Sequence, residues 1–418
     1  MFTERQKRII HHAYETVPFY ADLCREKGLE YRNFVKWEDI PTVSKNDVVL
    51  HNNAFISSKY LLEESQGRLL CTHTSGSTGK CTNVYWNLEE CRYSLTPLWL
   101  RRRRYYKIST NARYCYFFTS RHGNSMNIEK EESEFALGFS KQNLDEEKLV
   151  YIWGEMRKFR PEWLNLQPSM ALLLCQVIRK YQLKLISSLK YVELTGEMLF
   201  PAVKNLLEVT LKVKVVNQYG SIEMNSIAFE CPMGHLHCLK ENVNVEIVDK
   251  NGTEVPLGKE GEICVTTLTN YAMPLIRYKL GDYGRLSTVK CSCGEKGLVL
   301  ELTKGRCNDY IIDSEGVLLN PYIFVHCVEN VNKKYEMAIL QFQIIQRTTS
   351  SFTVNFVLDT EYMIEQICDC FIRGLEHTSL SSAVFDFYIH QEIFPEQSTG
   401  KLRWFINEIG GDLENMIL

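Results

Sequence analysis

From residue 69 to residue 218 the chain alternates short apolar segments with longer amphipathic ones, and this alternation constrains its fold more than any other feature. Segments with the length and composition of buried strands lie at 69–73, 113–119, 163–166, 191–195 and 212–218. Segments with helical periodicity lie at 88–106, 151–159, 169–181 and 200–208. Strands that alternate with helices form parallel sheets covered by those helices, so an α/β fold is expected.

The segments on either side of this region predict a different organisation. Residues 5–24 have helical spacing, and Pro18 either kinks or ends that helix. Residues 243–285 read as β-hairpins or a barrel-like part, with a turn at Asp249–Gly252. Beyond residue 306, two paired strands, a helix and a last strand predict a small α+β unit. We therefore expect a large domain at 1–305 and a smaller one at 306–418.

Composition excludes several classes of function. The net charge of −3 gives no general attraction to nucleic acids or anionic membranes. The run Arg101–Arg104 continues a predicted helix, and a solvated helix end is expected there rather than a polyanion site. No segment approaches the ~20 apolar residues of a membrane span, and no signal-peptide core is visible. An odd number of scattered cysteines, fifteen, favours free thiols in a reducing cytoplasm.

A loop rich in glycine and hydroxyl residues follows the first predicted strand. Its residues are Thr74, Ser75, Gly76, Ser77, Thr78, Gly79 and Lys80. Such a loop can bring backbone N–H groups, hydroxyls and an ammonium group close to phosphate oxygens. The spacing differs from that of a P-loop, because two residues separate the glycines and Cys81 follows the lysine. Taken alone, the loop could also be a polar turn between strands.

Four further segments follow this loop in a fixed order: Gln218–Glu223, Arg277–Asp282, Gly305–Asp309 and Ser398–Lys401. Together the five resemble the signature motifs of adenylate-forming enzymes, which include acyl-CoA synthetases, adenylation domains and luciferases. The segments His12–Tyr20, Ile40–Lys45, Pro274–Tyr278 and Asn320–Pro321 are similar to the phenylacetate–CoA ligase-like branch of that superfamily. The resemblance extends over nearly the whole chain. It implies a large adenylate-forming domain and a mobile C-terminal lid.

The resemblance also implies where ATP and magnesium bind. It assigns ATP contacts to Thr74–Lys80, Tyr219, Gly220, Ser221, Asp282 and Arg306. Glu223 would bind Mg²⁺, since a hard divalent ion takes carboxylate and phosphate oxygens. Asp282 would accept hydrogen bonds from the ribose hydroxyls.

Three residues would carry the reaction itself: Lys401, Glu223 and Arg306. Lys401 would swing from the lid onto the reacting oxygens, and Arg306 would reach ribose or phosphate from the domain junction. Two positions depart from the pattern of the superfamily. Asn308 stands at the hinge where Asp or Lys is common, and Leu280 replaces a hydroxyl residue before Gly281.

A second cluster of potential ligands combines cysteine and histidine. The segment Cys231–Cys238 precedes Cys291-Ser292-Cys293, and two separated ligand pairs are what a tetrahedral zinc site needs. Some relatives of the branch carry a Cys-x5-His and Cys-x-Cys pattern. By resemblance the zinc ligands are Cys231, His237, Cys291 and Cys293, with His235 and Cys238 as alternatives. Reduced, partly buried thiols without metal are the competing interpretation.

The expected activity is the formation of an acyl-adenylate from ATP and a carboxylic acid, followed by transfer to coenzyme A or a carrier-protein arm. Alternatives are a non-thiol acceptor and a catalytically silent nucleotide- or zinc-binding homologue, and a homodimer stays open. Aromatic residues predict a planar acid, unless they are strand core. The candidate pocket residues are Tyr116, Phe117, Phe118, Arg121, His122, Glu193, Thr195, Gly196 and Glu197.

Overall fold

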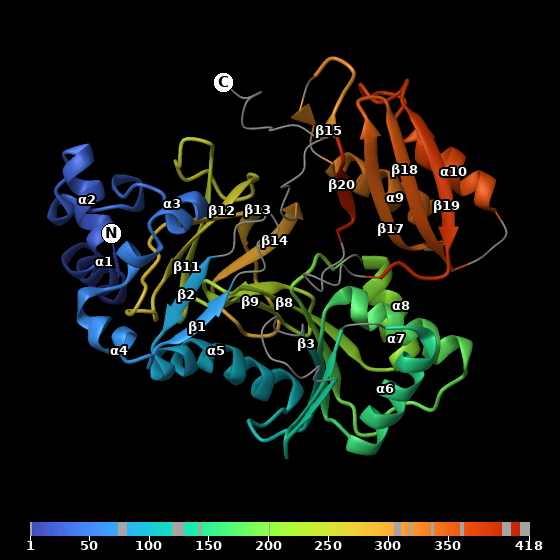
Figure 1. Cartoon of the computed structure of the whole chain (residues 1–418), viewed down its shortest axis with the longest axis horizontal. Helices are drawn as coiled ribbons and strands as arrows, with labels where there is room; N and C mark the ends of the chain where they lie inside the picture. Colours follow the sequence, from blue (N-terminus) through green and yellow to red (C-terminus); the bar gives the residue numbers. More distant parts are fainter. Residues whose placement is uncertain are drawn as a thin grey trace.

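A computed structural model describes most of the chain. The described residues are 2–73, 82–118, 129–141, 144–199, 201–304, 311–316, 318–319, 321–335, 338–359, 363–394 and 403–409. Figure 1 shows helices of the N-terminal segment at one end, a long sheet in the middle and a smaller C-terminal sheet at the other end.

The N-terminal segment is helical and packs on the antiparallel end of the central sheet. Its helices are α1 (Glu4–Thr16), α2 (Pro18–Lys27), α3 (Lys45–Leu50) and α4 (Leu61–Ser65). Pro18 ends the first helix instead of kinking it, because Val17 is extended and Pro18 opens α2. Ile9, Ile10 and Ala13 bury their side chains against the core of this end.

One sheet of twelve strands forms the centre of the molecule. Its order is β11-β12-β13-β14-β10-β9-β8-β7-β6-β3-β5-β4. The parallel half contains β8 (Lys214–Ser221), β7 (Tyr191–Thr195), β6 (Trp163–Leu166), β3 (Tyr114–Phe118) and β5 (Ala136–Ser140). The strand β4 (Lys130–Glu132) pairs antiparallel with β5 at the edge. These strands confirm the expected α/β pattern.

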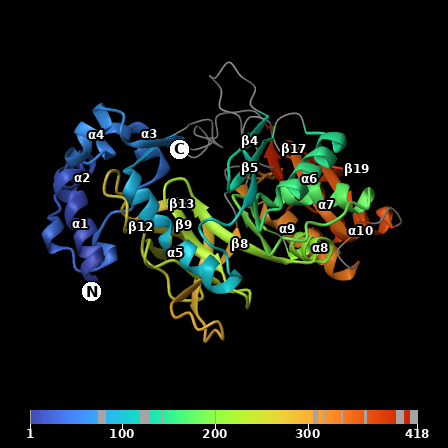
Figure 2. The ribbon, with the colours of Figure 1, turned by 90° about the horizontal axis from the view of Figure 1, so that it is seen from below.

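Helices cover both faces of the parallel half (Figure 2). They are α5 (Leu88–Tyr106) on one face and α6 (Glu146–Phe159), α7 (Pro168–Lys180) and α8 (Pro201–Leu211) on the other. Side chains alternate along the strands to serve both faces. Trp163 and Tyr191 pack with the α5 side chains, whereas their neighbours Leu164 and Val192 pack with α6 to α8.

The other half of the sheet is antiparallel. It comprises β9 (Asn225–Glu230), β10 (Leu236–Cys238), β14 (Leu298–Lys304), β13 (Tyr278–Thr288), β12 (Gly261–Thr267) and β11 (Val243–Val248). A barrel-like part was expected here, but in the described residues these strands continue the large sheet and no barrel closes. A separate hairpin pairs β1 (Leu70–His73) with β2 (Asn83–Trp86).

The C-terminal unit has its own core. Its elements are β15 (Ile311–Ile312), β16 (Leu318–Leu319), α9 (Tyr322–Lys334), β17 (Ile339–Thr348), β18 (Ser351–Leu358), α10 (Ile364–Arg373), β19 (Val384–His390) and β20 (Phe405–Asn407). The sheet order is β19-β18-β17-β20, and phenylalanines of α9, α10 and the strands fill the core. Leu340 of β17 packs on Leu172 of α7. The expected boundary between residues 305 and 306 lies outside the described residues.

No helix in the described part of the chain is both long and apolar enough to cross a membrane.

Candidate functional site

The predicted nucleotide residues occupy two places that are distant in the sheet order. Tyr219, Gly220 and Ser221 end β8, and Glu223 follows in the turn to β9. Asp282 lies on β13, which three strands separate from β8. Side chains rather than backbone pairs therefore join these two motifs.

Two tyrosine–carboxylate hydrogen bonds make this connection. The hydroxyl of Tyr219 donates to Oδ2 of Asp282 over 2.7 Å. The hydroxyl of Tyr278 donates to Oε1 of Glu223 over 3.1 Å. Each motif thus supplies one tyrosine and one carboxylate to the other, and the two hydrogen bonds connect the end of β8 with β13. Tyr278 was not among the residues predicted for the site.

Close backbone approach explains the glycine in the first of these motifs. A Cβ atom on Gly220 would lie 2.2 Å from the backbone oxygen of Asn225, so only glycine fits. Asn225 itself has a φ of 57° and donates from Nδ2 to Oγ of Ser94 on α5 over 2.8 Å. The turn that carries Glu223 is thereby fixed to the helix that follows the β1–β2 hairpin.

Several predicted site residues cannot be placed. The loop Thr74–Lys80, the hinge residue Asn308, Arg306 and Lys401 all lie outside the described residues. The strands around the loop are paired, with His73 opposite Asn83, so the loop connects the two strands of a hairpin. The roles of these residues remain predictions.

Arg277 begins the segment predicted to bind ribose. In the structure its side chain is buried and makes structural contacts. Its guanidinium donates to the backbone oxygens of Ile40 and Gly252 over 2.6 and 2.7 Å and to Glu246 over 3.2 Å. Its φ of 50° is unusual for a residue with a side chain. Burial raises the pKa of Glu246 to about 7, against the opposing effect of Arg277. This latch joins the N-terminal segment to the start of β13.

The basic run on α5 is only in part the solvated helix end that the sequence suggested, because Arg103 and Arg104 are exposed whereas Arg101 and Arg102 are buried. Arg102 is buried and forms two hydrogen bonds with Glu193, of 2.8 and 2.5 Å. Its guanidinium carbon lies 4.6 Å from the ring centres of both Trp99 and Trp163. Burial alone would lower the pKa of Arg102, but the Glu193 carboxylate raises it overall. Helical spacing turns this arginine toward the sheet, where a carboxylate distant in sequence neutralises it.

This ion pair also changes the interpretation of the acid pocket. Glu193 was a candidate for contacting polar substituents of the acid. Its side chain is fully buried, pairs with Arg102 and accepts a hydrogen bond from the Tyr191 hydroxyl. Glu197 accepts hydrogen bonds from the backbone N and Oγ of Ser169 and so caps α7. Phe117 belongs to the strand core, as the competing interpretation held. Arg121 and His122 lie outside the described residues.

A small hollow with a cavity volume of about 50 Å³ lies where the C-terminal unit meets α7 and α8. Glu197 and Met198 line one side of it, and Phe342 and Trp404 line the other. Trp404 follows Lys401 by three residues in the sequence. The segment that leads away from the predicted catalytic lysine is therefore next to the loop after β7.

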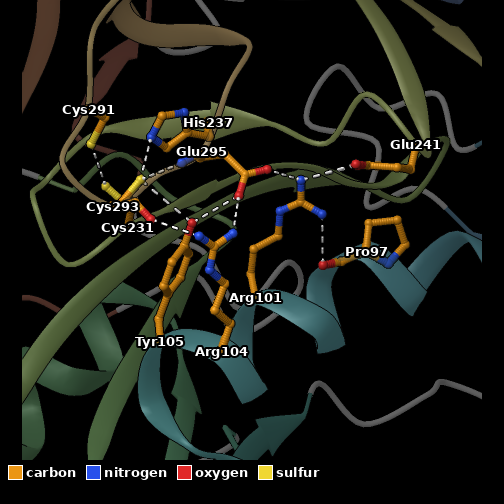
Figure 3. A network of polar contacts seen from close by, with 10 residues as sticks. All are labelled: Pro97, Arg101, Arg104, Tyr105, Cys231, His237, Glu241, Cys291, Cys293 and Glu295. Carbon is orange, nitrogen blue, oxygen red and sulfur yellow. Dashed lines mark hydrogen bonds and ion pairs between the residues drawn. The ribbon is translucent and has the colours of Figure 1, made fainter.

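The predicted zinc ligands come together. Ligand atoms of Cys231, His237, Cys291 and Cys293 all lie within 4.8 Å of one another. The Cys231 and Cys291 sulfurs are 3.7 Å apart, and Nε2 of His237 lies 3.4 Å from the Cys293 sulfur (Figure 3). Three sulfurs and one imidazole nitrogen match the ligand set of a structural zinc site. His235 is a close alternative, with Nδ1 3.2 Å from the Cys291 sulfur.

Strand geometry separates the alternatives left open by the sequence. Adjacent residues of β10 point to opposite faces, so His237 faces the thiols whereas Cys238 packs with the hydrophobic core on the other side. Burial accordingly raises the pKa of the Cys238 thiol to about 12.

Side chains of α5 surround this cluster (Figure 3). Arg101 and Arg104 contact Glu295 at 2.5 and 3.3 Å, and Arg104 also donates to the backbone oxygen of Cys293. The Tyr105 hydroxyl lies 3.1 Å from Glu295 and 3.7 Å from the Cys293 sulfur. Burial raises the pKa of that thiol, but the Glu295 N–H and neighbouring hydroxyl and thiol groups lower it overall. This network was not predicted, because its members are remote in the sequence.

Comparisons with known proteins agree with these features. Residues 64–271 match the family model described as AMP-binding enzyme. A phenylacetate-coenzyme A ligase of Thermus thermophilus is 28% identical over 92% of this chain and 84% of its own length. Protein CapK of Staphylococcus aureus is 22% identical over 94% of this chain and 85% of its own length.

Solved structures show the same fold. A 2-hydroxyisobutyryl-CoA ligase in the postadenylation state has a TM-score of 0.75 at 17% identity, covering 97% of this chain and 88% of that one. The same ligase in the thioesterification state has a TM-score of 0.62, covering 99% and 90%. The structure thus superposes better on the postadenylation arrangement. From the ordered motifs, the joined carboxylates and these similarities, we conclude that the chain belongs to the adenylate-forming enzymes, the superfamily of the AMP-forming acid–thiol ligases.

Proposed function

We propose that this enzyme activates a small carboxylic acid with ATP and transfers the acyl group to a thiol. In the first step an acid oxygen bonds to the α-phosphorus, and the bond to pyrophosphate breaks. In the second step the thiolate sulfur bonds to the acyl carbon, and AMP leaves with its oxygen. The observation that carries the proposal is the pair of hydrogen bonds that unite Glu223 with Tyr278 and Tyr219 with Asp282.

The two carboxylates that accept these hydrogen bonds would bind opposite ends of ATP, the ribose end and the phosphate end. Asp282 would accept the ribose hydroxyls, and Tyr219 would lie against adenine. Glu223 would hold Mg²⁺, whose positive charge would offset the negative charge of the phosphate oxygens. The Thr74–Lys80 loop would add N–H and hydroxyl donors to the β- and γ-phosphates.

Lys401 would supply the mobile positive charge for adenylation, with Arg306 at the domain junction. A lid that rotates about Asn308 would remove Lys401 before the thiol enters. Support comes from the hollow beside Trp404 and from the better superposition on a postadenylation structure.

For the acid we propose an aromatic or other small planar compound, and for the acceptor coenzyme A. The names of two relatives, phenylacetate-coenzyme A ligases at 28% and 27% identity, support both. Because Glu193 is paired with Arg102, we do not assign this carboxylate a contact with substituents of the acid.

We further propose one structural zinc ion bound by Cys231, His237, Cys291 and Cys293. Four protein ligands leave no open position, so the metal would act by holding the β9–β10 turn against the β13–β14 turn. β9 directly follows the turn that contains Glu223, and β13 contains Asp282.

Pyrophosphate release with ATP and a panel of acids tests the function. Lys401→Ala should nearly abolish acid-dependent release and leave ATP binding little changed, because the lysine contact forms mainly in the transition state. Arg373→Ala, which removes an exposed cation of α10, is the matched control and should retain activity. Near-normal turnover by Lys401→Ala would refute the assignment. Pyrophosphate release without formation of a thioester would indicate a non-thiol acceptor. ATP binding without pyrophosphate release would indicate a catalytically silent homologue.

A further inference from the structure

Tyr278 is a buried residue at the start of β13 whose hydroxyl reaches a carboxylate 55 positions away. The backbone holds it firmly. Val43 pairs with it in an isolated bridge, and the flanking residues exchange hydrogen bonds with Val43 at 2.9 and 2.8 Å. Arg277, the preceding residue, is anchored by its guanidinium. The position of the Tyr278 hydroxyl is therefore set by the core of the antiparallel half.

Glu223 has a weaker support of its own. It lies in the turn between β8 and β9, outside both strands, and its side chain is buried. No strand backbone therefore sets the direction of this carboxylate, and a metal ligand loses affinity when its orientation must be fixed on binding. The hydroxyl of Tyr278, 3.1 Å from Oε1, can fix one rotamer before the metal arrives.

The chemistry of the donor matters here. A lysine or arginine at the same distance would orient the carboxylate but would also neutralise it and compete with a divalent cation. A phenol hydroxyl donates a hydrogen bond and leaves the negative charge on the carboxylate. The structure pairs both predicted acidic ligands with tyrosine hydroxyls, Glu223 with Tyr278 and Asp282 with Tyr219.

We propose that Tyr278 is a positioning residue that orients Glu223 for Mg²⁺ and thereby sets the magnesium requirement of adenylation. The inference rests on the proposed function, because it takes Glu223 as the magnesium ligand. Tyr219, through Asp282, would position the ribose end instead. The two hydroxyls therefore have separable effects on two different ligands.

Matched Tyr→Phe substitutions test this division, since each keeps the ring and removes one hydroxyl. Tyr278→Phe should raise the Mg²⁺ concentration for half-maximal pyrophosphate release about 10-fold, as other losses of residues behind a metal ligand do, and excess Mg²⁺ should restore the rate. Tyr219→Phe should instead raise the KM for ATP, with a smaller change in the Mg²⁺ requirement. An unchanged requirement in Tyr278→Phe, or equal changes in both variants, would overturn the proposal and leave Tyr278 a packing residue.

Binding measurements separate failure of this inference from failure of the proposed function. Calorimetry of ATP binding with and without Mg²⁺ needs no acid and no turnover. Tyr278→Phe should reduce the gain in ATP affinity that Mg²⁺ provides, and Glu223→Gln should reduce it further. If neither substitution changes that gain, Glu223 is not the ligand and the inference falls, whatever acid the enzyme uses. If only Glu223→Gln changes it, the magnesium role stands and that of Tyr278 is refuted.

Discussion

Breaking the ion pair between Arg102 and Glu193 should be among the most damaging single changes in the large sheet. The two side chains have relative exposures of 7% and 0%, and two hydrogen bonds of 2.8 and 2.5 Å join them. Removing one partner of a buried pair leaves a charge without compensation, which costs about 3–5 kcal/mol. Glu193→Gln keeps the shape of the side chain, so we expect a loss of about that size in the free energy of unfolding.

Each of the two single substitutions leaves one buried charge without its partner. Arg102→Met leaves the Glu193 carboxylate, and Glu193→Gln leaves the Arg102 guanidinium, which stays charged at every accessible pH. The double variant should cost less than the sum of both, because it leaves no buried charge.

Urea unfolding followed by tryptophan fluorescence would measure these effects, since the ring centres of Trp99 and Trp163 both lie 4.6 Å from the guanidinium carbon. Arg103→Met, at the exposed neighbouring position of α5, is the control and should change stability by no more than about 0.5 kcal/mol. Costs below about 1 kcal/mol for both single variants at equal m-values, or strict additivity in the double variant, would refute the reasoning.

Three further outcomes follow from the metal cluster and the lid. Cys291→Ser should lower both zinc content and melting temperature, measured by elemental analysis and calorimetry; metal-free wild-type protein of equal stability and activity would contradict the zinc proposal. His237→Gln should lose zinc whereas His235→Gln should retain it, and the reverse result would exchange their roles. Asn308→Pro should slow either pyrophosphate release or thioester formation much more than the other, because proline fixes φ at the hinge. Equal slowing of both half-reactions in a stable variant would count against alternation.

Local patterns predicted much of the architecture. The segment at 88–106 became α5 with the same ends, and the strands at 163–166 and 191–195 were confirmed without change. Such segments are defined by periodicity and by residues near their own ends. The cysteine and histidine spacing likewise predicted residues that the structure brings together, since the pairs lie on adjoining turns.

Side-chain contacts between residues that are distant in the sequence could not be predicted from such local patterns. Arg102 and Glu193 are 91 positions apart, and nothing near either residue indicates its partner, so the burial of Arg102 was not predicted. Tyr278 and Glu223 are 55 positions apart, and their pairing depends on how β8 and β13 are placed in the sheet, which the sequences of the individual strands do not state. For the same reason the antiparallel half was expected to be barrel-like, although its backbone does not close in the described residues.

The latch formed by Arg277 limits how segments could be exchanged between relatives. The family model spans residues 64–271, so Ile40 and Arg277 lie on opposite sides of the matched region. A chimera cut at either boundary would separate the guanidinium from the carbonyl oxygen that it reaches over 2.6 Å. An N-terminal graft would therefore have to bring a backbone carbonyl in the same register, or leave a buried cation with one acceptor fewer. The N-terminal segment is in this sense not a detachable addition, because its backbone and β13 have to match.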